Sequence, residues 1–434
     1  MTNTCARLKG RNLPVPAPPW AMFLFLALMF FLAGHDFYYS VKRMGVFDPT
    51  ENEQVTTVSE GSLRCRIGYL GLGMLGAVCL LRKSRTRFKV RGALAWLMLS
   101  YVAWVSSSLA WAQDGALTFR RLVILGMMCL CALGVSRRLS SRHIVAWILF
   151  STAAYLLIGL LAESVLGSFH PFAPGHRFAG TIHPNLQGLN CALLALSGAA
   201  ASRTRWRSRN FFRALGLIGF VFLVLTGSRT AFGATVLALL FYWSLVWPRL
   251  RTFAVTYSAI TILVFLLFVG GGAFLPVLQR AALLGRESSS AGTLSGRILV
   301  WQECLGYVAN RPFQGYGYGG FWTPIHISEI SATQGWGVAE AHSAYLDLLL
   351  TVGLIGLVIF ILMLAVAISR SVACYRLSQN PAYAFFAALL FLCALEGLME
   401  STVATRSMFS FACMLALANL SFRDAPTGRQ TASP

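Results

Sequence analysis

The sequence has little charge and very little negative charge. Of its 434 residues, 12% are charged, and 15 Asp and Glu stand against 36 Lys and Arg. With 56% hydrophobic residues and a mean hydropathy of +0.65, the chain has too few polar side chains to cover a water-facing surface of ordinary composition. This composition excludes an ordinary soluble protein and indicates that lipid is the solvent.

Two motifs for handling nucleotides are also missing. The chain contains neither a Walker A sequence nor an Asp-x-Asp pair, so ATP hydrolysis and metal-held binding of a nucleotide sugar lack their usual residues. A donor already carried across the membrane on lipid would not need these motifs, because arginine can neutralise its leaving diphosphate in place of a metal ion. We therefore predict a site without metal and a protein without a cofactor.

Apolar runs recur along the whole chain, each bounded by charge, Pro or Gly. They approach the roughly 20 residues that a helix needs to cross the bilayer, and no segment is left over for a soluble domain. We predict an all-α polytopic membrane protein with about twelve transmembrane helices. The predicted spans are 20–34, 67–81, 92–112, 119–135, 144–162, 185–201, 214–226, 231–247, 253–275, 342–369, 383–399 and 407–421.

The net charge of +21 and the pI near 10.2 would also suit a nucleic-acid-binding protein, so the position of the cations decides. Loops 82–91 and 203–213 are short and basic, whereas nearly all acidic residues fall on the other side. The positive-inside rule then predicts that both termini are cytoplasmic. The expected partners are anionic membrane lipids, and nucleic acid is excluded.

The chain divides into four predicted segments. Residues 1–275 hold the first nine spans, 276–341 form a large outer loop, 342–421 hold the last three spans, and 422–434 form a cytoplasmic tail. Within the loop, a surface helix is predicted between a Ser295 cap and Pro312. Its apolar stripe is predicted to be Ile298, Trp301, Leu305 and Val308.

Three outer arginines are candidates for binding an anion. Arg229 lies between two apolar spans, where an unpaired guanidinium is costly, and Arg297 lies where a cation opposes the helix dipole. Arg177 precedes the sixth span. From the residues alone, Arg229 could instead extend to lipid phosphate or pair with an acid, and Arg177 could be an ordinary loop charge.

Histidine supplies a candidate base. His342 lies at the start of the tenth span, and a neutral imidazole can take a proton from a sugar hydroxyl. Glu340 or Asp347 could orient it, and His183 is predicted to orient or pack. The residues alone leave open that His342 is only a structural residue at a helix start.

Several motifs now occur in a recognisable order: Gly227-Ser-Arg-Thr230, Ser295-Gly-Arg297, Arg311-Pro-Phe-Gln-Gly-Tyr-Gly317 and Ala341-His-Ser-Ala-Tyr-Leu-Asp347. In this order they resemble the O-antigen ligase and polymerase superfamily of bacterial membrane glycosyltransferases. The resemblance extends over about residues 90–421. The family often has Asn where this chain has Ser343, which puts the positioning of His342 in question.

The resemblance implies a GT-C-like helical membrane enzyme with a large periplasmic loop between its ninth and tenth helices, in the bacterial inner membrane. It implies a metal-independent, inverting transfer of an undecaprenyl-diphosphate-linked glycan to a sugar hydroxyl on the periplasmic face. By position, Arg177, Arg229 and Arg297 would hold the diphosphate and His342 would be the catalytic base. Glu340, His183 and Asp347 would support them.

Two reactions share this chemistry. A polymerase passes the glycan to another lipid-linked glycan, whereas a ligase passes it to the lipid A core oligosaccharide. The stretches Gly315-Tyr-Gly-Tyr-Gly-Gly-Phe-Trp322 and Ala341–Leu350 resemble the exopolysaccharide polymerases more closely. Polymerase is therefore the first prediction and ligase the alternative. A polytopic transporter or flippase is the non-enzymatic alternative.

Overall fold

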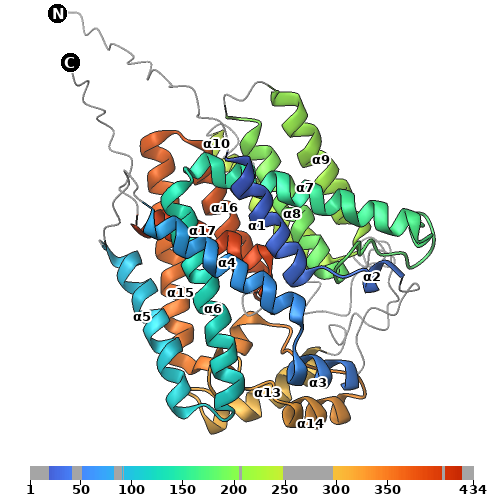
Figure 1. Cartoon of the computed structure of the whole chain (residues 1–434), viewed down its shortest axis with the longest axis vertical. Helices are drawn as coiled ribbons and strands as arrows, with labels where there is room; N and C mark the ends of the chain where they lie inside the picture. The colour runs from blue at the N-terminus through green and yellow to red at the C-terminus, as the bar shows by residue number, and fades with distance from the viewer. Residues whose placement is uncertain are drawn as a thin grey trace, which may run out of the picture.

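The computed structural model describes residues 19–41, 51–82, 90, 92–204, 208–247, 297–402 and 406–422. Over these ranges the chain forms helices joined by loops, with no strand (Figure 1). The prediction of an all-α protein is confirmed. Six of the described helices are long and apolar enough to cross a membrane.

Every predicted span outside 253–275 coincides with a helix. The span 253–275, the cap at Ser295 and the first part of the large loop lie outside the described residues, so the count of twelve crossings stays a prediction. The helices on predicted spans are α1 (Trp20–Gly34), α4 (Leu63–Leu81), α5 (Ala93–Ser107), α6 (Gly115–Arg138), α7 (Ser141–Val165), α8 (Pro184–Ala201), α9 (Arg209–Leu225), α10 (Arg229–Val246), α15 (Ala344–Ser378), α16 (Pro381–Glu396) and α17 (Met408–Phe422).

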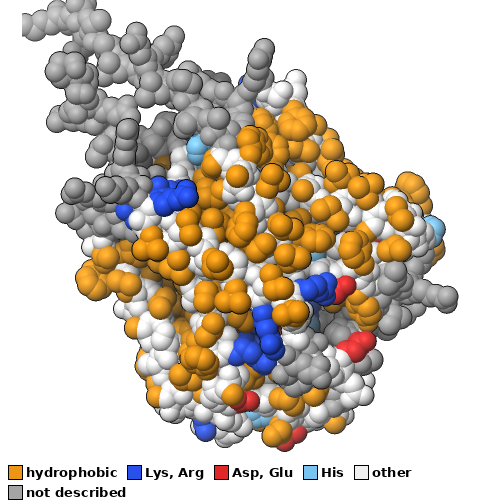
Figure 2. Space-filling model, viewed as in Figure 1, with side chains coloured by type: hydrophobic (Ala, Val, Ile, Leu, Met, Phe, Trp, Pro, Cys, Tyr) orange, Lys and Arg blue, Asp and Glu red, His pale blue; other side chains and the backbone are white. Residues whose placement is uncertain are grey.

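Small residues let these helices pack closely, as membrane helices commonly do. On α4, a Cβ at Gly76 would lie 2.5 Å from the backbone of α6, and on α8 one at Gly198 would lie 2.6 Å from Gly216 of α9. Outward-facing positions are apolar instead: Leu24, Met74 and Leu217 are each more than half exposed. Figure 2 shows this broad hydrophobic surface, which suits contact with lipid chains.

Three shorter helices lie together at one end of the bundle (Figure 1). These are α3 (Glu51–Glu60), α13 (Arg297–Asn310) and α14 (Pro324–Gln334), and we call them the cap. The remaining short elements are α2 (Tyr38–Val41) and the 3-10 helix η1 (Ser108–Trp111). The cap has its own apolar core, which includes Val300, Cys304, Phe321, Ile327 and Ile330.

The predicted surface helix exists as α13, but its predicted stripe is partly wrong. Leu305 is 52% exposed, while Val300 and Cys304 are fully buried. The cause is tertiary, because α14 and α15 both pack against the face of α13 that carries Val300 and Cys304.

The glycine-rich segment after α13 is built into a break in α15. Gly353 has a left-handed φ of 68°, and a Cβ there would lie 2.2 Å from the carbonyl oxygen of Phe313. The amides of Tyr316 and Gly317 donate to the carbonyls of Leu350 (2.8 Å) and Thr351 (2.9 Å). The segment thus uses carbonyls that the broken helix leaves free, and it fixes the cap to the start of α15.

Candidate functional site

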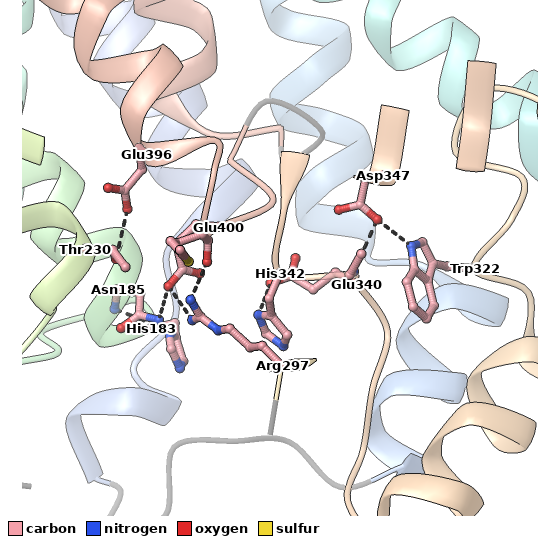
Figure 3. A network of polar contacts seen from close by, with 12 residues as sticks. His183, Asn185, Thr230, Arg297, Trp322, Glu340, His342, Asp347, Glu396 and Glu400 are labelled. Carbon is pink, nitrogen blue, oxygen red and sulfur yellow. Dashed lines mark hydrogen bonds and ion pairs between the residues drawn. The ribbon is translucent and has the colours of Figure 1, made fainter. Parts of the chain in front are cut away.

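Polar side chains from distant segments meet beside the cap (Figure 3). At their centre is Glu400, just beyond the end of α16, whose Oε1 accepts hydrogen bonds from Arg297 Nη2 at 2.7 Å and Asn185 Nδ2 at 2.9 Å. The side chains of Arg297 and Glu400 are only 15% and 8% exposed. Arg297 also donates to the carbonyl of Met399, so this ion pair is desolvated and held from two directions.

Arg177 joins the same network through Asn185. Its Nη2 donates to Asn185 Oδ1 at 2.6 Å, and its Nε donates to the carbonyl of Thr226 at 2.9 Å. One linked set of contacts therefore runs from Arg177 through Asn185 and Glu400 to Arg297. Two of the three predicted diphosphate residues are brought together, although they are far apart in the sequence.

A buried carboxylate holds the backbone of the loop that carries Arg177. Glu163, near the end of α7 and 2% exposed, accepts hydrogen bonds through Oε1 from the amides of Ala179 (2.9 Å) and Gly180 (2.6 Å). His183 then caps α8, its Nδ1 accepting from the amide of Asn185 at 3.2 Å. Glu163 and His183 thus place Arg177 and Asn185 by holding the backbone.

Arg229 is the first residue of α10 and is half-buried. The turn before it lies against Arg177, because a Cβ at Gly227 would be 3.3 Å from Arg177 Nε. The residue after it, Thr230, donates to Glu396 Oε1 at 3.4 Å. The backbone of Arg229 therefore lies between Arg177 and the acidic end of α16.

His342 lies on the other side of Arg297, with its Nδ1 3.2 Å from Glu340 Oε1 (Figure 3). Its ring packs near Trp336, at 5.7 Å between centroids. Burial and Arg297 act to lower the pKa of His342, but Glu340 and Glu400 outweigh them and raise that pKa above its ordinary value. Burial acts to raise the pKa of Glu340, yet His342 and nearby cations hold it below its usual range. The pair therefore favours a charged imidazole.

The backbone at His342 is fixed on both sides. Its φ is 50°, an uncommon conformation for a residue other than Gly. The preceding residue, Ala341, accepts from Trp301 Nε1 at 2.8 Å and donates to Asp347 Oδ1 at 3.2 Å, and Trp322 Nε1 donates to Asp347 at 2.8 Å. Of the two predicted orienting acids, Glu340 lies beside the ring, whereas Asp347 contacts the backbone before it.

Among the described residues, Glu340, His342 and Glu400 could also hold a metal ion, since their ligand atoms lie within 4.8 Å of one another. Arg297 already neutralises Glu400 at 2.7 Å, and its charge opposes a dication at this position. This arrangement suits an anion between the arginines better than a cation between the acids.

Sequence reasoning missed Glu400, Asn185 and Glu396. The first two link the predicted arginines, and Glu396 is fully buried beside Thr230. Asn185 begins the predicted span 185–201, and Glu396 and Glu400 lie at the end of the predicted span 383–399. The sequence does contain acids on the same predicted outer face as the arginines, and this could have indicated ion pairs. It does not show which acid pairs with which arginine.

The site can be compared with known proteins through its motifs. Residues 214–361 match the family model described as O-Antigen ligase. This match supports the predicted resemblance to the O-antigen ligase and polymerase superfamily, and it contains Arg229, Arg297 and His342. None of the curated proteins compared with the chain matches it.

At the level of the superfamily, the match supports a membrane protein of glycosyltransferase type, of the kind that acts as a ligase or polymerase on lipid-linked glycan. Arg177, Asn185 and Glu400 lie outside the matched residues but inside the contact network around Arg297. The structure thus extends the site beyond the matched segment.

Proposed function

We propose that this chain is a bacterial inner-membrane polymerase of surface polysaccharide, transferring an undecaprenyl-diphosphate-linked glycan to a sugar hydroxyl on the periplasmic face. The observation that carries the proposal is the position of His342. It lies between Glu340, 3.2 Å away, and the network that joins Arg297 through Glu400 to Arg177. A base thus adjoins a cluster of guanidinium groups.

The reaction is a single displacement. His342 takes the proton of the acceptor hydroxyl as its oxygen bonds to the anomeric carbon of the donor, on the face opposite the diphosphate. The bond from that carbon to the diphosphate oxygen breaks, the configuration inverts, and the lipid diphosphate leaves with the bonding electrons. Glu340 stabilises the imidazolium that results.

Arg177, Arg229 and Arg297 neutralise the departing diphosphate, so the reaction is proposed to need no metal. Guanidinium groups donate several hydrogen bonds in a fixed plane and stay charged at any working pH. Arg177 and Arg297 are already held by Asn185 and Glu400, which fixes their directions before substrate arrives. Activity that persists in a chelator is the expected result.

Ligase activity is the second candidate, favoured by the description of the matched family. A ligase would use the same residues and differ only in taking the lipid A core oligosaccharide as acceptor. Purified protein with a labelled lipid-linked oligosaccharide separates the two. Longer lipid-linked glycan without added core indicates a polymerase, and labelled lipid A core indicates a ligase.

The base is tested in the same assay by His342→Ala. We expect transfer to fall by about 10²- to 10⁴-fold, the usual loss when a general base is removed. His170→Ala is the matched control, an exposed histidine of the loop before α8, and it should keep wild-type transfer. Wild-type transfer by His342→Ala would remove the base assignment, and glycan movement without a new glycosidic bond would favour the transporter alternative.

A further inference from the structure

A second group of arginines, which takes no part in the proposed reaction, lines two adjoining cavities. The larger cavity, about 660 Å³, lies between α1, α4, α6, α8 and the start of α17. The smaller, about 280 Å³, lies between α5, α6, α15, α16 and α17. Both are lined by Arg121 and Arg406, so they adjoin at these two side chains.

The larger cavity has a lining that is basic and apolar. Arg66, Arg120, Arg121 and Arg406 line it, and no described residue of its lining is acidic. The rest of the wall is mostly apolar, with side chains such as Phe30, Leu70, Phe119, Ile124 and Leu189. On the face drawn in Figure 2, basic side chains likewise interrupt a broad hydrophobic surface near the cap.

Arg121 and Arg406 are both half-buried, and no described residue that lines the larger cavity beside them is acidic. Nε of Arg121 is a buried donor with no hydrogen-bond partner among the described residues. Burial lowers the pKa of Arg406, and the neighbouring charge of Arg120 acts in the same direction. Half-buried guanidinium groups such as those of Arg121 and Arg406 are costly in free energy unless an anion pairs with them.

The smaller cavity connects this group to the site. Besides Arg121 and Arg406 it is lined by Glu340 and Asp347, and Glu340 lies 3.2 Å from His342. Arg297 and Glu400 lie on the opposite side of that histidine in Figure 3. His342 is therefore placed between two separate groups of arginines.

We propose that the cavity at Arg121 and Arg406 binds the diphosphate head and first isoprene units of a second lipid-linked glycan, the acceptor. This rests on the proposed function, since a polymerase needs two lipid diphosphates at once. The donor occupies Arg177, Arg229 and Arg297. The acceptor enters through the apolar cavity and presents its sugar hydroxyl to His342 past Glu340. A phosphate-bearing apolar chain matches both the charge and the walls.

The number of bound lipids tests the site without requiring transfer. Native mass spectrometry of the full chain with undecaprenyl diphosphate should show two lipids per chain in the wild type. One lipid is expected for Arg121→Gln combined with Arg406→Gln, and two for Arg213→Gln, an exposed arginine of α9 that lines neither cavity. A single lipid in the wild type, or two in the double variant, would overturn the proposal.

Two further experiments test whether an ordinary phospholipid can fill the cavity and whether the double variant loses the lipid only because it misfolds. Excess phosphatidylglycerol should leave both lipids bound; if it displaces one, the cavity is a general phospholipid site and the proposal fails. Arg121→Lys combined with Arg406→Lys keeps both charges and should bind two lipids, which separates loss of charge from a folding defect at the same positions. Because binding is counted directly, failure of transfer leaves this result intact.

In the transfer assay, the double variant should raise the KM for the acceptor roughly tenfold or more, since hydrogen bonds to a charged group are lost. The KM for the donor should stay unchanged. An equal rise in both KM values would place Arg121 and Arg406 with the donor and overturn the assignment to the acceptor.

Discussion

Arg297 and Glu400 are 103 positions apart in the chain, yet their side chains meet at 2.7 Å. Arg297 could be singled out from its motif, and so could His342. Glu400 could not, because it stands among several outer acids and only the folded chain brings it to Asn185 and Arg297. At the residue scale, the sequence predicts the candidate reacting groups, while their partners depend on contacts between distant segments.

The pH dependence of transfer should report the contact between Glu340 and His342. A base must be neutral to accept a proton, so activity falls as the pH drops through the pKa of His342, which Glu340 raises. In Glu340→Gln, burial and Arg297 remain and both lower that pKa. We therefore expect the acid limb of kcat/KM to move to lower pH.

The matched control for this experiment is Glu329→Gln on α14. Glu329 is an exposed acid that accepts from Tyr307 at 3.0 Å and has no described contact with His342. Its profile should follow the wild type. An acid limb that stays in place in Glu340→Gln would show that the imidazole is not the titrating base.

At the scale of elements, α15 and the segment 311–320 form one unit. The sequence predicts a span over 342–369 and a tight glycine-rich segment before it, but not that the segment docks into a break at Gly353. Hydropathy does not record where a helix breaks. The break follows from the backbone partners that residues 312–317 bring to α15.

Gly353→Ala should destabilise the protein. A left-handed φ of 68° is strained for Ala, and its Cβ would lie 2.2 Å from Phe313 O, so we expect a loss of about 2 to 4 kcal/mol. Thermal unfolding in detergent measures it. Gly126→Ala on α6, where a Cβ meets nothing within 4 Å, should be neutral or slightly stabilising. Equal stability of the two variants would contradict this account of the break.

At the scale of the whole molecule, the cap lies at one end of the helices (Figure 1), and the polar network adjoins it through Arg297 of α13. The positive-inside rule predicts that this end is periplasmic. The described residues beside the predicted inner loops, such as Arg82, Arg203 and Arg209, fall at the other ends of the helices. This arrangement agrees with the predicted periplasmic site, on the face where the proposed lipid-linked donor is expected.

Cysteine labelling in intact cells tests this orientation. A membrane-impermeant maleimide should label Thr333→Cys, an exposed position on α14, in a chain that otherwise shows little labelling. Asn210→Cys, exposed at the start of α9, should react only after the membrane is permeabilised. The opposite pattern would place the candidate site in the cytoplasm and exclude the proposed reaction.

The sequence by itself determined the class of the protein: apolar helices, the positions of most of them, the resemblance to a superfamily that the family match supports, and several candidate site residues. It could do so because hydropathy and short motifs are local properties. Only the tertiary structure decided that Glu400 links the arginines, that a glycine-rich segment fills a break in α15, and that Arg121 and Arg406 share two cavities. Each of these depends on side chains or backbone groups brought together from distant segments, and no local pattern encodes such an encounter.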